Sequence, residues 1–257
     1  NRISPVQVGS LTNWNSIASG QQHIIATKTD GTLWSWGNNG MGELGLGDTT
    51  KYSSPVQVGT RTWNKVSVSN DASYAIRTDG TLWSWGANNN GQLGLGNTTS
   101  YSSPKQVGAL TNWLSTASGL YINIAVKTNG TLWGWGAGAN AFSGSSYSSP
   151  KQIGALTSWV KAACNGSYGV ATKNDGTLWS WGFNYYGNLG LGNTSQYNSP
   201  KQIGALTTWS YPAGGVNNSG YAIKTNGTLW VWGTNTYGEL GTNNVTYYSS
   251  PVQVGAL

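Results

Sequence analysis

The chain has 257 residues, only 8% of which are charged, and its 13 Lys and Arg against 7 Asp and Glu give a formal net charge of +6. This length suits a single all-β propeller or barrel, so a second domain is not required. The low charge and the 38 glycines indicate a surface solvated by neutral polar groups. We expect this of an extracellular or virion-surface protein, with a cytoplasmic location as the alternative.

One motif recurs along the whole chain. It reads S-P-[VK]-Q-[VI]-G, then Trp, then [DN]-G-T-L-W-x-W-G, then a Gly/Asn-rich stretch, and its prolines from Pro5 to Pro251 are 50, 49, 46, 50 and 51 residues apart. Such a period indicates a solenoid, a propeller or another array. The predicted repeats, within one domain of residues 1–257, are 4–53, 54–102, 103–148, 149–198 and 199–249, with a partial sixth at 250–257.

In the first repeat we predict short strands near 6–8, 15–18, 23–28 and 33–36. Asp30-Gly31 lies between the last two, and such a pair is a strong signal for a β-hairpin turn. Side chains alternate along a strand, so both indoles of a W-x-W pair, such as Trp34 and Trp36, project to one side of the sheet. Four short strands per repeat match one propeller blade, and two indoles can seal the wedge to the next blade.

The second repeat carries a resemblance to a known family. It reads D-G-T-L-W-S-W-G from Asp79 to Gly86, then Asn88, then G-Q-L-G-L-G from Gly91 to Gly96, and then Ser103-Pro104 and Gln106-Val107. In these residues the chain resembles the regulator of chromosome condensation repeat family. The resemblance implies a ring of four-stranded blades, seven in well-known members. With five repeats we favour a closed five-bladed β-propeller, and the alternative is an open arc of a larger ring.

Catalysis is not expected. Outside the turns only Glu43, Asp48, Asp71 and Glu239 are acidic, and they do not pair in sequence. His23 is the sole histidine, and one histidine with the sole cysteine, Cys164, does not make a zinc site. We expect Cys164 to be a small buried filler and predict no metal and no cofactor. No apolar segment is long enough for a membrane span. The basic residues recur singly rather than in a cluster, which argues against nucleic-acid binding.

Binding is the class that remains, and the positions that differ between repeats are its candidates. They fall in two zones, one before the hairpin and one after the W-x-W-G strand, and both are rich in Tyr and Asn, as recognition loops are. The candidate binding residues of the first zone are Gln21, Gln22, His23, Asp71, Tyr74, Tyr121, Asn123, Tyr168, Asn217 and Asn218. Those of the second zone are Asn39, Met41, Asn89, Phe142, Tyr185, Tyr186 and Tyr237.

The sequence thus predicts a non-catalytic module that presents these loops to a protein or a glycan, as part of a bacterial or viral surface protein. One alternative is a structural role in which the propeller packs against identical chains or within a larger complex. Another follows from the resemblance alone: the nucleotide-exchange factors of the family bind a small GTPase.

Overall fold

The computed structural model describes residues 7–10, 12–137, 146–215 and 218–255. Its regular elements there are β-strands, which form five four-stranded antiparallel sheets with the strands paired in sequence order. The predicted all-β class and the four strands per blade are confirmed. None of the described residues belongs to a helix that is long and apolar enough to cross a membrane.

Each sheet is one blade, and the strand bounds repeat from blade to blade. Blade 1 is β1 (Trp14–Ser19), β2 (His23–Lys28), β3 (Leu33–Gly37) and β4 (Tyr52–Gln57). Blade 2 is β5 (Trp63–Val68), β6 (Ala72–Arg77), β7 (Leu82–Gly86) and β8 (Tyr101–Gln106). Blade 3 is β9 (Trp113–Ser118), β10 (Ile122–Lys127), β11 (Leu132–Gly136) and β12 (Tyr147–Gln152). Blade 4 is β13 (Trp159–Cys164), β14 (Tyr168–Lys173), β15 (Leu178–Gly182) and β16 (Tyr197–Gln202). Blade 5 is β17 (Trp209–Gly214), β18 (Ser219–Lys224), β19 (Leu229–Gly233) and β20 (Tyr248–Gln253).

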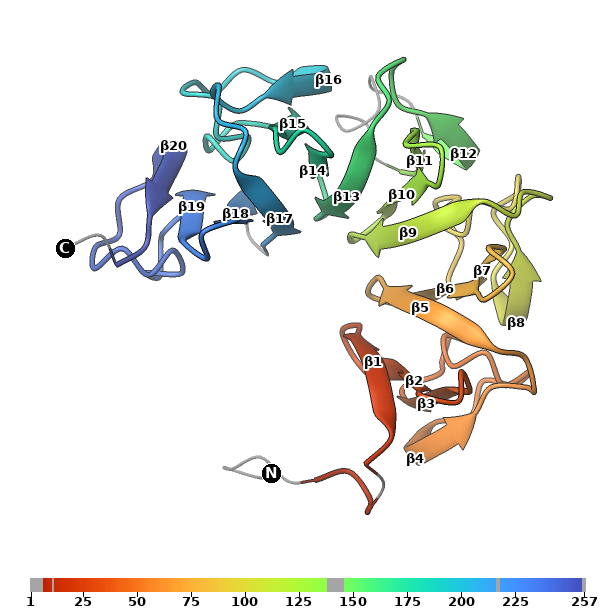
Figure 1. Ribbon diagram of the computed structural model, residues 1–257. Coiled ribbons are helices and arrows are strands. Elements are labelled where there is room, and N and C mark those ends of the chain that lie inside the picture. The colour runs from red at the N-terminus through yellow and green to blue at the C-terminus, as the bar shows by residue number, and fades with distance from the viewer. Residues whose placement is uncertain (1–6, 11, 138–145, 216–217, 256–257) are drawn as a thin grey trace.

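The blades follow one another around an axis, with β1, β5, β9, β13 and β17 on the inner side, but they do not close (Figure 1). Blades 1 and 5 stand at the two ends of an arc. The favoured closed five-bladed ring is therefore wrong, and the arc that we held as the alternative is observed. The physical reason is that the large side chains in each wedge set the rotation between neighbouring blades, and this step is too small for five blades to complete a circle.

The strand that contains the S-P-[VK]-Q motif, which we call the proline strand, is the last strand of each blade. In blade 1, Pro55 lies in β4, which pairs with β3. The predicted boundary between residues 53 and 54 thus cuts through a strand. The predicted partial sixth repeat is corrected in the same way, because Ser250 to Gln253 belong to β20 and complete blade 5. Of the strand expected at 6–8, residue 6 lies outside the described part and residues 7 and 8 are not in a strand.

The D-G-T-L-W segment folds by a local network. In blade 2, Asp79 Oδ1 accepts hydrogen bonds from Thr81 N at 3.0 Å and Thr81 Oγ1 at 2.6 Å. The Thr81 hydroxyl oxygen in turn accepts one from Trp83 Nε1 at 2.9 Å. These bonds hold the pKa of the Asp79 carboxyl below its ordinary value of 3.8. The turn acid is thereby a structural residue, as the hairpin signal predicts.

Both indoles of each W-x-W pair do face one side. In blade 2 the rings of Trp83 and Trp85 lie 6.3 and 6.1 Å from that of Trp63. Trp85 is fully buried against blade 1, beside Ile25 and Leu33. Equivalent apolar clusters join blades 2 and 3, 3 and 4, and 4 and 5. The core is therefore a series of wedges between blades rather than one centre.

In blades 1, 3, 4 and 5 the residue at the end of the second strand is a lysine that lies over the indoles. In blade 2 it is Arg77, which forms an ion pair with Asp79 at 2.9 Å, and Arg61 lies over the Trp83 ring instead. Lys127 Nζ lies 3.5 Å from the ring centroid of Trp133, and Lys224 Nζ lies 3.6 Å from that of Trp230. An ammonium group over an indole face is attracted by the ring quadrupole. Burial lowers the pKa of both lysines. Their regular recurrence thus has a structural cause that does not involve a polyanionic partner.

Candidate binding rim

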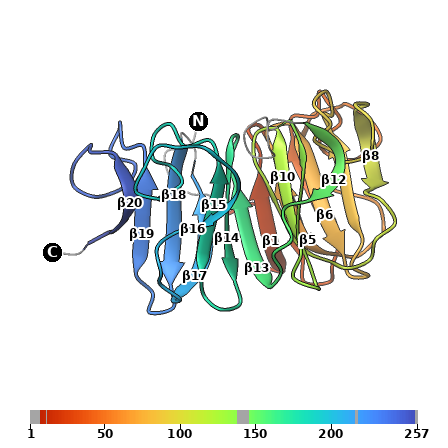
Figure 2. The ribbon, with the colours of Figure 1, turned by 90° about the horizontal axis from the view of Figure 1, so that it is seen from above.

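The two variable zones meet at one end of the blades. Strands run between two rims (Figure 2), and we call the rim formed by the β1–β2 and β3–β4 loops and their equivalents the loop rim. Within a blade these two loops are hydrogen-bonded to each other: Asn38 N donates to Gln22 O at 2.8 Å, and Ala87 N donates to Asp71 O at 2.8 Å. The loops that vary between repeats are therefore presented together.

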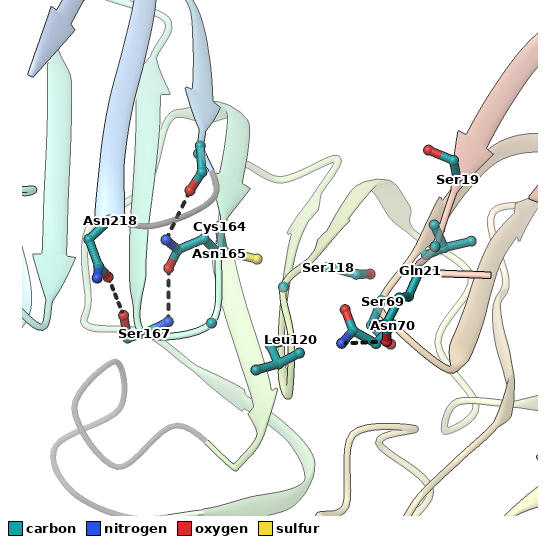
Figure 3. A pocket seen from close by; sticks show the side chains of 16 residues that line it. Ser19, Gln21, Ser69, Asn70, Ser118, Leu120, Cys164, Asn165, Ser167 and Asn218 are labelled. Carbon is teal, nitrogen blue, oxygen red and sulfur yellow. Dashed lines mark hydrogen bonds between the residues drawn. The ribbon is translucent and has the colours of Figure 1, made fainter. Parts of the chain in front are cut away.

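The inner loops of the five blades surround a shallow hollow at the loop rim. Its volume is about 680 Å³, and it is lined by short polar residues and glycines (Figure 3). Neighbouring loops are joined across it, since Asn165 Nδ2 donates to Gly215 O at 3.0 Å and Ser167 Oγ to Asn218 Oδ1 at 3.2 Å. Cys164 also borders the hollow, but it is buried and burial raises the pKa of its thiol to about 12, so it is not a reactive thiolate. This agrees with its predicted role as a filler.

A cluster of aromatic side chains stands on the same rim between blades 4 and 5. The Tyr185 ring stacks on that of Phe183 at 6.2 Å, and Tyr186 lies 5.3 Å from Tyr185 and 6.3 Å from Tyr247. Tyr185 is 71% exposed and nearby Tyr237 is 85% exposed. A second hollow of about 340 Å³, lined by Tyr186, Tyr237 and Tyr247 among others, adjoins the cluster. We call Phe183, Tyr185, Tyr186, Tyr237 and Tyr247 the tyrosine cluster.

About half of the predicted site residues are exposed to solvent and can therefore contact a partner. The exposed ones are Gln21, Gln22, Met41, Asn89, Tyr121, Tyr185, Tyr186 and Tyr237. Asp71 and Asn218 are half-buried. Phe142 and Asn217 lie outside the described residues. A binding role for the exposed set stays a prediction, while its position on one rim is observed.

Five predicted site residues are buried, and the expectation that they face a partner is corrected. They are His23, Asn39, Tyr74, Asn123 and Tyr168. In blades 2, 3 and 4 both faces of the second strand are covered by neighbouring blades, so Tyr74, Asn123 and Tyr168 point into a wedge whichever face they occupy. Tyr74 OH, for example, donates to Gln92 O at 2.9 Å and accepts from Asn123 Nδ2 at 2.9 Å.

His23 and Asn39 are also structural. His23 Nε2 lies 3.0 Å from Ser73 Oγ, and burial lowers the pKa of His23 to about 4 despite the opposing charge of Asp71. Asn39 closes its loop, because its Nδ2 donates to Asp48 O at 3.0 Å and its Oδ1 accepts from Leu44 N at 2.9 Å. The sequence held a signal for Asn39: the equivalent residues in three other repeats are also Asn, at 88, 184 and 235.

Two residues of the tyrosine cluster were missed. Phe183 and Tyr247 occupy positions that hold Asn38 and Lys51 in the first repeat. The signal that selected the candidate residues, variation between repeats, applies to both. Tyr247 was passed over because it lies just before the proline strand, outside the two zones.

Two acidic residues of the rim accept hydrogen bonds from backbone N–H groups of their own loops. Glu43 Oε2 accepts from Met41 N at 2.7 Å, and Glu239 Oε2 accepts from Tyr237 N at 2.7 Å. Gln92 Oε1 does the same with Asn90 N at 2.8 Å, so an uncharged side chain is sufficient for this task. Among the described residues, no group of three or more His, Cys, Asp or Glu side chains is placed to hold a metal ion.

Blades in sequence order around one axis, with wedges sealed by indoles, define an open β-propeller of tandem repeats. The sequence profile of the regulator of chromosome condensation (RCC1) repeat matches residues 30–76, 79–126, 175–220 and 226–257, and a second profile of that description matches 14–43 and 63–92. These matches cover more than half of the chain, which belongs to the RCC1 repeat family. No curated protein matches it in sequence.

Solved structures support the same fold. Human WBSCR16 is 23% identical with a TM-score of 0.84, over 94% of this chain and 67% of that one. Yeast RCC1 (Prp20), solved bound to Kap60, is 19% identical with a TM-score of 0.82, over 95% of this chain and 64% of that one. Prp20p of Saccharomyces cerevisiae, described with its binding properties to Gsp1p and histones, is 20% identical with a TM-score of 0.81 over 95% and 66%. This chain thus spans about two thirds of the length of these proteins.

Proposed function

We propose that this propeller is a non-catalytic binding module that holds a protein partner on its loop rim. The observation that carries the proposal is the tyrosine cluster, in which large rings on a rigid scaffold project into solvent instead of packing into a wedge. Two of the similar structures have protein partners: yeast Prp20 was solved bound to Kap60, and Prp20p is described with its binding properties to Gsp1p and histones. A glycan is the alternative ligand.

Tyrosine suits such a surface for a physical reason. Its ring supplies a large contact area with few rotatable bonds, so little conformational entropy is lost on binding, and its hydroxyl can form hydrogen bonds with the partner. Contacts among Tyr185, Tyr186 and Phe183 restrict the rings further before any partner arrives. The adjoining hollow gives a partner side chain a place to insert.

The test selects ligands for the intact chain from two probes, a displayed library of random peptides and a printed array of glycans. Selected ligands are then measured against the double variant Tyr185→Ala/Tyr186→Ala. Leu206→Ala, in the β16–β17 loop, is the matched control because Leu206 is 49% exposed but lies at the opposite rim. We expect peptide binding that the double variant loses and the control keeps. Peptides that bind both variants equally would contradict the site, and ligands only on the glycan array would replace the protein by a sugar.

Regulation of a small GTPase is the other candidate, and it is suggested by the fold shared with Prp20. Its test is direct: the chain is mixed with a panel of small GTPases loaded with a fluorescent nucleotide, and nucleotide release is followed. We also propose a location on a bacterial or viral surface, which the sparse charge and the neutral polar rim support.

A further inference from the structure

The loop rim differs in charge from the chain as a whole. The β1–β2 and β3–β4 loops and their equivalents contain four acidic residues, which are Glu43, Asp48, Asp71 and Glu239. The same loops contain one basic residue, Lys51. The rim is therefore acidic, although the formal net charge of the chain is +6. Charge complementarity favours a basic partner on such a surface.

One of these acids, Glu239, lines the hollow of about 340 Å³ beside the tyrosine cluster. Tyr186 of the β15–β16 loop lines the hollow with Tyr237 and Tyr247 of the β19–β20 loop, so its walls come from two neighbouring blades. The rings of Tyr186 and Tyr247 are in edge contact at 6.3 Å, and a hydrogen bond joins Tyr247 OH to Thr236 Oγ1. The hollow thus combines one carboxylate with three aromatic rings.

The Glu239 carboxylate has one oxygen available for a ligand. Its Oε2 accepts a hydrogen bond from Tyr237 N at 2.7 Å, whereas Oε1 has no hydrogen-bond partner in the described part of the chain. In blade 1 the equivalent Glu43 uses both oxygens, because Asn38 Nδ2 donates to Oε1 at 2.6 Å and a backbone N–H donates to Oε2. Blade 5 has Thr234 in place of Asn38, so it has no amide at this position.

The loop that contains Glu239 does not need its negative charge. Gln92 occupies the same position in blade 2 and accepts the equivalent hydrogen bond from Asn90 N at 2.8 Å. Glu239 has no counterion within the chain either, since the one ion pair among the described residues joins Arg77 to Asp79. The charge in the hollow is therefore free to attract a cation from outside.

The rings of the hollow also lack a cation that other tyrosines in this fold have. Four tyrosines elsewhere have a lysine Nζ between 4.5 and 5.6 Å from the ring centroid. They are Tyr101, Tyr147, Tyr197 and Tyr211. Over the described residues, no Lys or Arg lies against a ring of the tyrosine cluster. Because the face of a tyrosine ring attracts an ammonium or guanidinium group, these rings can accept one from a partner.

The exposure of these rings is a property of the loop type and not of blade 5 alone. The position of Tyr237 holds Met41 in blade 1, Asn90 in blade 2 and Tyr186 in blade 4. All three side chains are exposed, although another blade follows each of them. A ring at this position therefore remains accessible beside a following blade.

We propose that this hollow binds a basic side chain, of Lys or Arg, that belongs to the protein partner on the loop rim. The cationic group then donates a hydrogen bond to Glu239 Oε1 and lies against the rings of Tyr186, Tyr237 and Tyr247. The volume of the hollow is near the lower end of the range of about 300–1,000 Å³ for ligand sites, which suits one side chain. This inference rests on the proposed function, because it states the chemistry of the partner at the same site.

The test uses small probes that carry the side-chain chemistry alone. They are n-butylammonium for lysine, n-butylguanidinium for arginine and n-butanol as the neutral control. Each probe is titrated at constant ionic strength into the full chain with isotope-labelled tyrosine rings, and the ring resonances are followed by NMR. We expect both cations to give saturating shifts at Tyr186, Tyr237 and Tyr247, and n-butanol to give none at the same concentrations. Tyr121, which is exposed in blade 3, is the internal reference and should not shift.

Two variants separate the carboxylate from the rings. Glu239→Gln removes the charge but keeps an acceptor for Tyr237 N, as Gln92 does in blade 2, so the loop should persist. We expect it to weaken binding of both cations about three- to fivefold, as for the loss of a partly exposed ion pair. Tyr237→Ala should weaken binding about two- to fivefold through the loss of one ring face. Glu43→Gln, at the same loop position in blade 1, is the matched control and should bind as the wild type does.

Three results would overturn the inference. They are equal binding of the cations by the wild type and Glu239→Gln, saturating shifts with n-butanol, and shifts at Tyr121 as large as those in the hollow. The peptide selection separates this inference from the proposed function. Probes that bind while no selected peptide depends on Tyr185 and Tyr186 would overturn the proposed function and leave a site for free organic cations. Peptides that depend on these tyrosines but keep their affinity when every Lys and Arg is replaced by Met would support the proposed function and overturn this inference.

Discussion

The wedges and the loop rim are made by the same repeats, yet the sequence constrains them in opposite ways. At the wedge, the second tryptophan of the W-x-W pair occurs in all five repeats. In blades 2 to 5 this tryptophan is fully buried. At the rim, the position of Tyr185 holds Gly40 in the first repeat and Asn89 in the second. A wedge side chain is fitted to a neighbouring blade, whereas a rim side chain contacts water. Substitutions should therefore separate the two regions by their effect on stability.

The largest loss is expected in a wedge. Trp85→Ala removes a fully buried indole and its bond to Glu43 O, and we expect it to lower the free energy of unfolding by about 3–5 kcal/mol, the usual range for truncating a large buried side chain. Urea unfolding followed by tryptophan fluorescence measures this. Trp36→Ala is the matched control, because Trp36 is the equivalent indole in blade 1 and is only half-buried, so its removal should cost clearly less. Equal losses would mean that the neighbouring blade contributes little to wedge stability.

The second effect depends on pH and arises in the wedge between blades 1 and 2. The pKa of His23 is about 4 in the folded chain and 6.5 ordinarily, so between these values the unfolded chain holds the proton more tightly. Stability is therefore lost as the pH falls from 6.5 towards 4, by up to about 3 kcal/mol. His23→Gln should remove this dependence. Urea midpoints at pH 7 and pH 5 measure it for both proteins.

The aspartates of the hairpin turns do not contribute to the difference in stability between pH 7 and pH 5. The pKa values of Asp30, Asp79 and Asp175 are lowered from 3.8, chiefly by hydrogen bonds to the following Thr. Their contribution to stability is complete above pH 3.8 and is lost only as the pH falls below that value. A wild-type chain equally stable at pH 7 and pH 5 would contradict the burial of a neutral His23.

The third effect on stability compares a buried residue with an exposed one in the same kind of rim loop, the loop between the third and fourth strands of a blade. Asn39→Ala removes the amide that joins Asp48 O and Leu44 N, and leaving such groups unpaired should cost about 1–3 kcal/mol. Asn89→Ala, at an exposed position of the equivalent loop in blade 2, should change stability by less than about 0.5 kcal/mol. Thermal unfolding of the two variants decides. Equal losses of stability would mean that burial does not distinguish rim residues that hold a loop together from rim residues that are exposed to solvent.

These examples show what the sequence could and could not predict. The Asp-Gly and Asn-Gly turns, the W-x-W face and the four-stranded blade were predictable because each depends on local geometry that recurs in all five repeats. Closure was not, because the rotation between blades depends on how whole wedges pack. Strand periodicity also failed to expose Tyr74 and Asn123 as core residues, since in a blade covered on both sides neither strand face is free. Variation between repeats therefore marks rim residues only outside the strands.

The smallest effect on stability is expected at the tyrosine cluster, where the largest effect on binding is also expected. Tyr185→Ala removes a ring that is 71% exposed and packs against the rings of Phe183 and Tyr186, so the melting temperature should stay within the change caused by about 0.5 kcal/mol. Affinity for a selected peptide should fall at least tenfold, because an aromatic anchor at an interface commonly contributes about 2 kcal/mol or more. Calorimetry on the same samples measures both quantities. A variant that melts like the wild type and binds like it would place the partner elsewhere on the rim, whereas one that melts much lower would show that the cluster belongs to the wedge.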